Sequence, residues 1–171
     1  MESQTGIVLI GMAGAGKSSI GRRLAKTLSR RFIDTDTLIE HAAGCSLQEI
    51  IAARGLGTFR ALEEDILLRL DPGSSVVATG GSSVYSHKGM LHLRKKGFVI
   101  FLEVELSLLA KRIRNFDSRG LVKLPEQSFS DLYRERQPLY HRYADYIFSC
   151  NTLSEREICS RLVQLLHNKK L

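Results

Sequence analysis

The sequence has no tryptophan, only three cysteines and three prolines, and no apolar stretch of the length that crosses a membrane. Cys45, Cys150 and Cys159 are odd in number and far apart, and they form neither a C-x-x-C pair nor a zinc-binding spacing with the five histidines. A disulfide-stapled or zinc-stabilised fold is therefore not indicated. The cysteines predict free thiols in a reducing cytoplasm.

Low-complexity tracts, internal repeats and blocks of basic residues are also missing. The net charge is +7, but the basic residues are spread along the chain without a groove-reading motif, which favours a small anionic ligand over nucleic acid. The apolar segment 6–16 follows Glu2 instead of a positively charged region, so it does not look like a signal sequence. We expect no nucleic-acid partner, no membrane association and a monomer.

What is present is typical of an ordinary globular protein. The 171 residues, 43% hydrophobic and 25% charged, fit one domain over residues 1–171. Short apolar runs alternate with helix-like segments, at residues 7–10, 32–33, 76–78, 98–102 and 146–148. This alternation predicts an α/β fold of three layers, in which a central parallel sheet of about five strands has helices on both faces.

Two S-x-x-E patterns mark expected helix starts. They lie at Ser46–Glu49 and Ser154–Glu157, and each matches a capping box. The second pattern opens a C-terminal helix, and the apolar residues expected to face the core from it are Ile158, Leu162, Leu165 and Leu166.

The segment from Gly11 to Ser18 fits the phosphate-binding pattern G-x-x-x-x-G-K-[ST] and lies between an apolar run and a helix-like stretch over residues 19–28. Glycines let backbone N–H groups turn inward on a phosphate, and the following helix adds unpaired N–H groups and a positive dipole end. A glycine-rich turn that binds nothing is the alternative, and the order of strand, loop, Lys-Ser and helix argues against it. The residues expected to contact nucleotide phosphates are Gly11, Gly14, Ala15, Gly16, Lys17, Ser18 and Ser19, with the Ser18 hydroxyl on Mg²⁺.

A carboxylate that helps to hold Mg²⁺ has to come from outside the central strand, because that strand ends in Gly80-Gly81-Ser82. Asp34 and Asp36 follow the short strand at residues 32–33, and in an extended segment both would project to the same side. One carboxylate could then lie near the metal and the other near an acceptor hydroxyl. The alternative is that Thr35 or Asp36 caps a helix beginning at Leu38.

Two arginines have equally open interpretations. Arg60 precedes Glu63 and Glu64 by three and four residues, which fits either a surface ion pair or an arginine fork held for a substrate carboxylate. Arg136 stands shortly before Pro138, which is expected to end or bend its helix.

The periodicity fails between residues 115 and 130, where the chain is polar and contains Gly120 and Pro125. This pattern predicts a mobile lid over approximately residues 115–130, placed above the nucleotide. A solvated linker is the alternative, and it would require Arg119 to be irrelevant to activity.

Taken together, the motifs resemble those of the shikimate kinase family over nearly the whole chain. They are G-x-x-G-x-G-K-S, D-T-D, F-R-x-x-E, the Gly-Gly after the central strand, an arginine in the lid and R-x-P-L-Y, in the family's order. The resemblance implies a nucleoside-monophosphate-kinase-like P-loop kinase fold. It also implies transfer of the ATP γ-phosphoryl group to a ring hydroxyl of shikimate, with ATP and Mg²⁺ as cofactors.

The resemblance further implies roles for individual residues. On the nucleotide side, Lys17 and Ser18 match the phosphate and metal ligands, Asp34 reaches Mg²⁺ through water, Arg112 lies along adenine and Arg119 closes on the phosphates. On the acceptor side, Asp36 matches the candidate general base. The remaining acceptor matches are Arg60 and Arg136 on the shikimate carboxylate, Gly80 and Gly81 beside it, and Glu63 as a residue that orients arginine.

Three positions depart from the family pattern. Ser82 replaces a third glycine, Leu56 replaces a glutamate, and Gly120 replaces the proline of the lid motif. These departures keep two alternatives open. One is a different small hydroxylated carboxylate, such as homoserine, as the acceptor, and the other is a nucleotide-binding regulator that does not turn over.

Overall fold

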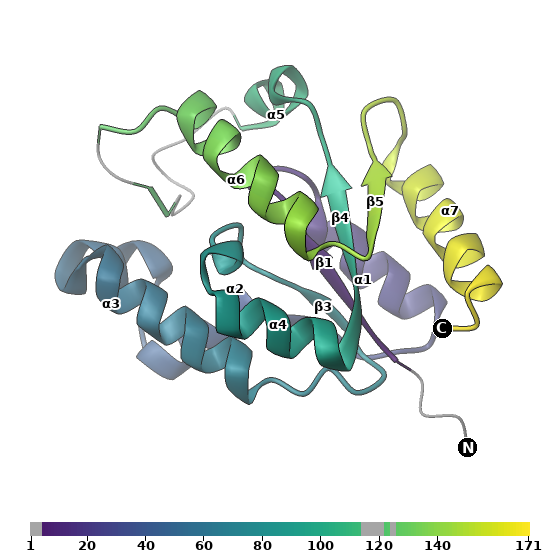
Figure 1. Ribbon diagram of the computed structural model, residues 1–171, viewed down its shortest axis with the longest axis horizontal. Helices are drawn as coiled ribbons and strands as arrows, with labels where there is room; N and C mark the ends of the chain where they lie inside the picture. Colours follow the sequence, from purple (N-terminus) through teal and green to yellow (C-terminus); the bar gives the residue numbers. More distant parts are fainter. Residues whose placement is uncertain (1–4, 114–121, 124–125) are drawn as a thin grey trace.

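The computed structural model describes residues 5–113, 122–123 and 126–171, and its centre is a parallel sheet (Figure 1). The strands are β1 (Gly6–Ile10), β2 (Phe32–Asp34), β3 (Val76–Ala78), β4 (Gly97–Glu103) and β5 (Tyr146–Ser149). They lie in the order β2-β3-β1-β4-β5, and all four pairings are parallel. Every predicted strand is therefore confirmed, with ends within two residues of those expected.

Helices cover both faces of the sheet, as predicted. They are α1 (Lys17–Thr27), α2 (Thr35–Ala43), α3 (Leu47–Arg69), the 3₁₀ turn η1 (Ser83–Tyr85), α4 (His87–Lys96), α5 (Leu106–Arg112), α6 (Phe129–Tyr143) and α7 (Glu155–Asn168). In Figure 1 α1 and α7 pack together beside the sheet, whereas α4 and α6 lie across its other face. Right-handed crossovers impose this division, because the chain leaves β1 toward β2 in one direction and β3 toward β4 in the other.

The apolar character of each strand follows its place in the sheet. The five residues of β1 and the three of β3 are all buried, as expected for strands covered on both faces. β5 lies at the edge, where Tyr146 and Ile147 are 37% and 42% exposed. No helix among the described residues is both long and apolar enough to cross a membrane.

Local signals explain most helix boundaries. Ser46 and Ser154 form the predicted capping boxes with Glu49 and Glu157 at the starts of α3 and α7. On α7, Ile158, Leu162 and Leu166 are buried in the core, while Leu165 packs against it partly exposed.

Two helix boundaries differ from those expected. α2 begins at Thr35 and not at Leu38, because the Asp34 side chain accepts a hydrogen bond from the Asp36 N–H and caps the helix. α6 continues for five residues beyond Pro138, so of the two expected effects, an end or a bend, the proline does not end the helix.

The predicted lid is only partly described. Residues 114–121 and 124–125, including Arg119 and Gly120, lie outside the described residues, and α6 already begins at Phe129. Val122 is buried against a small cluster formed by Ile39, Ile50 and Phe59. This residue of the predicted lid segment thus packs on the α2 and α3 side of the molecule.

Candidate active site

The glycine-rich loop leaves the carboxyl end of β1 and turns directly into α1. Gly16 precedes the helix with φ +90°, a left-handed conformation that favours glycine. A Cβ atom at Gly11 would lie 2.8 Å from the carbonyl oxygen of Leu102, so the backbones approach too closely for a larger residue. α1 has no side-chain cap and no acidic residue in its first turn. Its N–H groups are therefore available to an anion.

Lys17 is nearly buried inside this loop, at 9% exposure. Its Nζ donates to the carbonyl oxygens of Gly11, at 2.6 Å, and Met12, at 2.8 Å. Burial lowers the Lys17 pKa to about 8, an effect partly opposed by the carboxylates of Asp36 and Asp34. The ammonium group is held at the loop, close to where phosphates would bind.

The D-T-D segment brings the carboxylates of Asp34 and Asp36 close to the glycine-rich loop. The Ser18 hydroxyl donates to Asp34 Oδ2 at 2.7 Å. Asp36 lies in the first turn of α2, so the two carboxylates are not in one extended segment, contrary to the sequence interpretation. Burial raises the Asp36 pKa to about 6, although the Lys17 charge opposes the shift.

A pocket of about 420 Å³ joins these groups. It is lined by Ala13, Gly14, Gly16, Lys17, Ser18, Ser19, Asp36, Thr79, Arg112 and Glu155. The phosphate loop, the candidate base and Arg112 were predicted from the sequence, and the pocket brings them together. Thr79 was not identified, although it directly precedes Gly80 at the end of the central strand.

A second pocket of about 410 Å³ extends along the loop toward α7. Arg112 and Glu155 line both pockets, and Arg112 Nη1 lies 3.4 Å from the Gly14 carbonyl oxygen. The Ser19 hydroxyl donates to Glu155 Oε1 at 2.6 Å. Glu155 was missed because its position inside the S-x-x-E pattern indicated only a helix start.

The predicted acceptor side, the region around Arg60 and Arg136, surrounds an aromatic ring that the sequence did not point to. The Arg60 and Arg136 guanidinium groups lie 4.2 Å and 5.2 Å from the centroid of the Tyr85 ring. Arg136 is 1% exposed and also donates to the Tyr85 hydroxyl at 3.3 Å and to the Val122 carbonyl oxygen. Two arginines from α3 and α6 thus converge on one ring.

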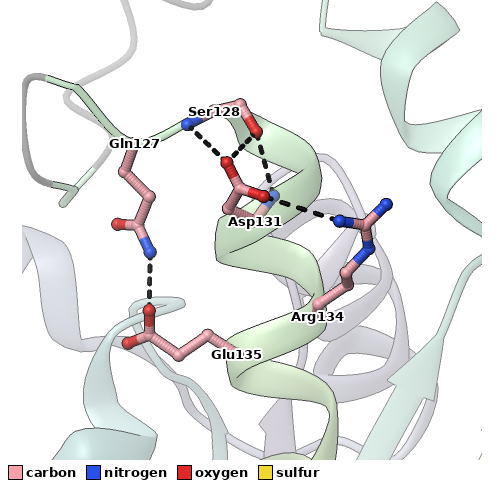
Figure 2. A network of polar contacts seen from close by, with 5 residues as sticks. All are labelled: Gln127, Ser128, Asp131, Arg134 and Glu135. Carbon is pink, nitrogen blue, oxygen red and sulfur yellow. Dashed lines mark hydrogen bonds and ion pairs between the residues drawn. The ribbon is translucent and has the colours of Figure 1, made fainter.

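The N-terminal half of α6 carries a network of polar contacts (Figure 2). Ser128 and Asp131 form a capping box, which starts the helix, and Arg134 pairs with Asp131 at 3.6 Å. Glu135 accepts a hydrogen bond from Gln127 at 2.6 Å and another from the Tyr85 hydroxyl at 2.5 Å. The helix that supplies Arg136 therefore also anchors Tyr85.

The segment after β3 links the phosphate side to the acceptor side. The Thr35 hydroxyl accepts a hydrogen bond from the Gly80 N–H at 3.0 Å, which ties the D-T-D segment to the glycines. A Cβ atom at Gly80 would lie 2.5 Å from Asp36 Oδ1 and 2.8 Å from Glu63 Oε1. Gly80 therefore permits two carboxylates to approach the backbone. The next residue, Gly81, accepts a hydrogen bond from the Tyr140 hydroxyl at 2.7 Å.

The surface ion pair considered for Arg60 is absent from the described residues. Glu63 is buried and accepts from the Ser82 hydroxyl, and Glu64 accepts from the Ser86 hydroxyl at 2.6 Å. Burial raises the Glu63 pKa to about 7, with the Ser82 hydrogen bond opposing the shift. Leu56, the position that departs from the family, packs against the cluster of Ile39 and Ile50.

Comparisons with known proteins agree with this arrangement. A family model described as Shikimate kinase matches residues 13–167. A protein named Shikimate kinase from Xylella fastidiosa (strain M12) is 36% identical over 166 residues, which cover 95% of this chain and 92% of that protein. Another, from Rhodopseudomonas palustris (strain ATCC BAA-98 / CGA009), is 38% identical over 165 residues, covering 95% and 81%.

Solved structures give the same result. A shikimate kinase from Acinetobacter baumannii in complex with shikimate superposes with a TM-score of 0.90 at 33% identity, covering 99% of this chain and 97% of that one. Thymidylate kinase from Candida albicans has a TM-score of 0.58 at 12% identity and so shares the fold alone. The predicted three-layer P-loop kinase fold is confirmed.

Proposed function

Because this chain belongs to the shikimate kinase family, we propose that it transfers the γ-phosphoryl group of ATP to a hydroxyl of shikimate. The observation that carries the proposal is the meeting of Asp36 with the phosphate loop on one side of Gly80 and with the arginine-facing Glu63 on the other. A carboxylate in this position lies between the phosphate-binding loop and the residues expected to bind the acceptor, so it can contact the acceptor hydroxyl. Phosphoryl transfer needs that positioning more than it needs covalent chemistry.

On the donor side, we propose that the loop N–H groups and the start of α1 hold the phosphates. Lys17 would exchange its two carbonyl partners for phosphate oxygens, which requires only a rotation of a long side chain. Arg112 would lie along the adenine. Arg119, by the family resemblance, would close on the transferred group.

The residues present also fit a magnesium ion carried with ATP. The Ser18 hydroxyl is a hard oxygen ligand, and the Asp34 carboxylate, 2.7 Å from it, would hold the ion through water. Among the described residues, no three His, Cys, Asp or Glu side chains cluster as a metal site. A cation with few protein ligands, completed by water and phosphate, is the usual condition of Mg²⁺ at such sites, where it neutralises developing charge.

On the acceptor side, we propose that Arg60 and Arg136 grip the shikimate carboxylate while Asp36 orients and deprotonates the reacting hydroxyl. Glu63 sits behind them, as the resemblance implies for an arginine-orienting residue. The Asp36 pKa of about 6 leaves the base ionised at neutral pH and still able to take a proton. The remaining expectations, a cytoplasmic monomer that binds no nucleic acid, belong to the same proposal.

The test is ADP formation by the purified protein with a panel of acceptors. Shikimate should support turnover in the presence of ATP and Mg²⁺, while homoserine, gluconate and nucleoside monophosphates should not. Preference for another panel member would replace shikimate as the acceptor. ATP binding without turnover of any member would favour the nucleotide-binding regulator.

A further inference from the structure

A buried serine holds the carboxylate at the back of the acceptor side. Ser82 and Glu63 are 1% and 2% exposed. Ser82 Oγ lies 2.8 Å from Glu63 Oε1 and 2.7 Å from Oε2, so one hydroxyl proton is shared between both carboxylate oxygens. No other hydrogen-bond donor to Glu63 occurs in the part of the chain that the structure describes. A carboxylate buried this deeply depends on such a partner to remain charged.

Charged and titratable groups face Glu63 from several elements. They are Lys17 on α1, Asp36 on α2, Arg60 on α3, and Arg136 and Tyr140 on α6. Neither arginine forms an ion pair with Glu63 within the described residues, and both lie over the Tyr85 ring instead. The Glu63 carboxylate thus takes its hydrogen bonds from the neutral Ser82 hydroxyl. The N–H groups of Arg60 and Arg136 remain available to other partners.

We propose that Ser82 is a positioning residue for the acceptor substrate. Its hydroxyl holds the Glu63 carboxylate beside Gly80, which leaves the guanidinium groups of Arg60 and Arg136 facing the substrate carboxylate. Without this hydroxyl, Glu63 is no longer held beside Gly80 and stops orienting Arg60 and Arg136 for the substrate. This inference rests on the proposed shikimate kinase activity.

The effect of Ser82 should depend on pH, because Glu63 can gain or lose a proton. The hydrogen bond from Ser82 favours the ionised carboxylate and so lowers its pKa, against the upward effect of burial and of Asp36. Loss of the hydroxyl therefore raises the Glu63 pKa. If ionised Glu63 supports the arginine arrangement, the acidic limb of kcat/KM for shikimate moves to higher pH.

The experiment compares Ser82→Ala with Ser83→Ala in the full chain. Ser83 is an equally buried neighbour, but its hydroxyl donates to Thr79 Oγ1 at 3.1 Å and contacts no carboxylate among the residues that the structure describes. Ser82→Ala should raise the KM for shikimate about 10-fold or more at pH 7, as expected for a lost hydrogen bond to a charged group. The KM for ATP and kcat should stay within about twofold of wild type. The acidic limb of the pH profile of kcat/KM for shikimate should shift to higher pH by roughly half a unit or more.

Two further measurements separate positioning from packing. In a Glu63→Gln background, Ser82→Ala should no longer move the pH profile, because the titrating group is gone. Without any substrate, Ser82→Ala should lower the unfolding temperature more at pH 8 than at pH 5, whereas Ser83→Ala should have the same effect at both.

The outcomes are distinct. If wild type turns over shikimate and Ser82→Ala matches Ser83→Ala in KM and pH profile, the inference is overturned. A pH-independent loss of stability with kcat and both KM values changed together overturns it as well. If wild type is inactive with shikimate, the proposed function fails, and the unfolding comparison alone decides whether Ser82 and Glu63 are coupled.

Discussion

The phosphate side and the acceptor side of this site are built in different ways. The phosphate side consists mainly of backbone groups in one contiguous loop, residues 11–18, with the start of α1 behind it. The acceptor side gathers side chains from α3, η1 and α6 around Tyr85. A contiguous loop carries its geometry in its own sequence, whereas the second arrangement exists only after folding brings distant helices together.

The largest effect is expected where the two sides meet, at Asp36. Asp36→Asn should lower kcat about 10²–10⁴-fold, because it removes the carboxylate proposed to take the hydroxyl proton. ATP affinity should change little, since the loop and α1 supply the phosphate contacts. Steady-state kinetics and ATP titration check this, with Asp65→Asn, on an exposed residue paired with Arg69, as the control. Normal turnover would show that Asp36 is not the base.

Substitution of Gly80 or Gly81 tests the same region, because these glycines lie between the phosphate side and the acceptor side. Gly80→Ala places a methyl group 2.5 Å from Asp36 Oδ1, so the base must move and kcat should fall roughly 10²-fold. At Gly81 the nearest atom to an added Cβ is Arg136 Nη1, at 3.0 Å. Gly81→Ala should therefore raise the KM for shikimate and spare kcat. The same kinetic pattern in both variants would contradict the division of roles.

A smaller change confined to the acceptor side should come from Arg136→Lys. Lysine keeps the charge but loses the planar fork, so the KM for shikimate should rise about 10–50-fold with the KM for ATP unchanged. Steady-state kinetics with each substrate varied in turn check the prediction. Equal changes in both KM values would remove Arg136 from the carboxylate site.

The smallest effect concerns stability and pH. The Glu63 pKa of about 7 in the folded protein lies above its ordinary value of 4.5, so the folded state binds more protons between these values. The free energy of unfolding should therefore fall as pH rises from about 4.5 to 7. Denaturant unfolding of Glu63→Gln should show a shallower fall, with a residual slope from Asp36. An unchanged slope would show that Glu63 does not titrate in this range.

The difference between a contiguous loop and side chains gathered from distant helices also explains which features the sequence could predict. The phosphate loop, the strands and both predicted capping boxes depend on neighbours within a few residues, and all were found. Arg60 and Arg136 had equally good surface interpretations until the family resemblance decided between them. Asp34 was expected to work beside an extended Asp36, but its carboxylate caps α2 and places Asp36 on a helical turn.

The residues that were missed depend on contacts across the fold. Tyr85 lies in a three-residue turn with no motif of its own, and its role comes from arginines on two helices and from Glu135. Ser82 was read as a departure near the acceptor pocket, whereas its hydroxyl contacts Glu63 on α3. A sequence pattern could have suggested Tyr85 only as an aromatic residue close to a glycine pair.

The two arginines over Tyr85 are proposed to hold the carboxylate of the acceptor. The most direct measurement is kcat/KM for shikimate against shikimate methyl ester, which keeps the ring hydroxyls and loses the charge. For the ester, kcat/KM should be about 10²-fold lower, mainly through a higher KM, with the KM for ATP unchanged. Equal kcat/KM values for acid and ester would contradict it.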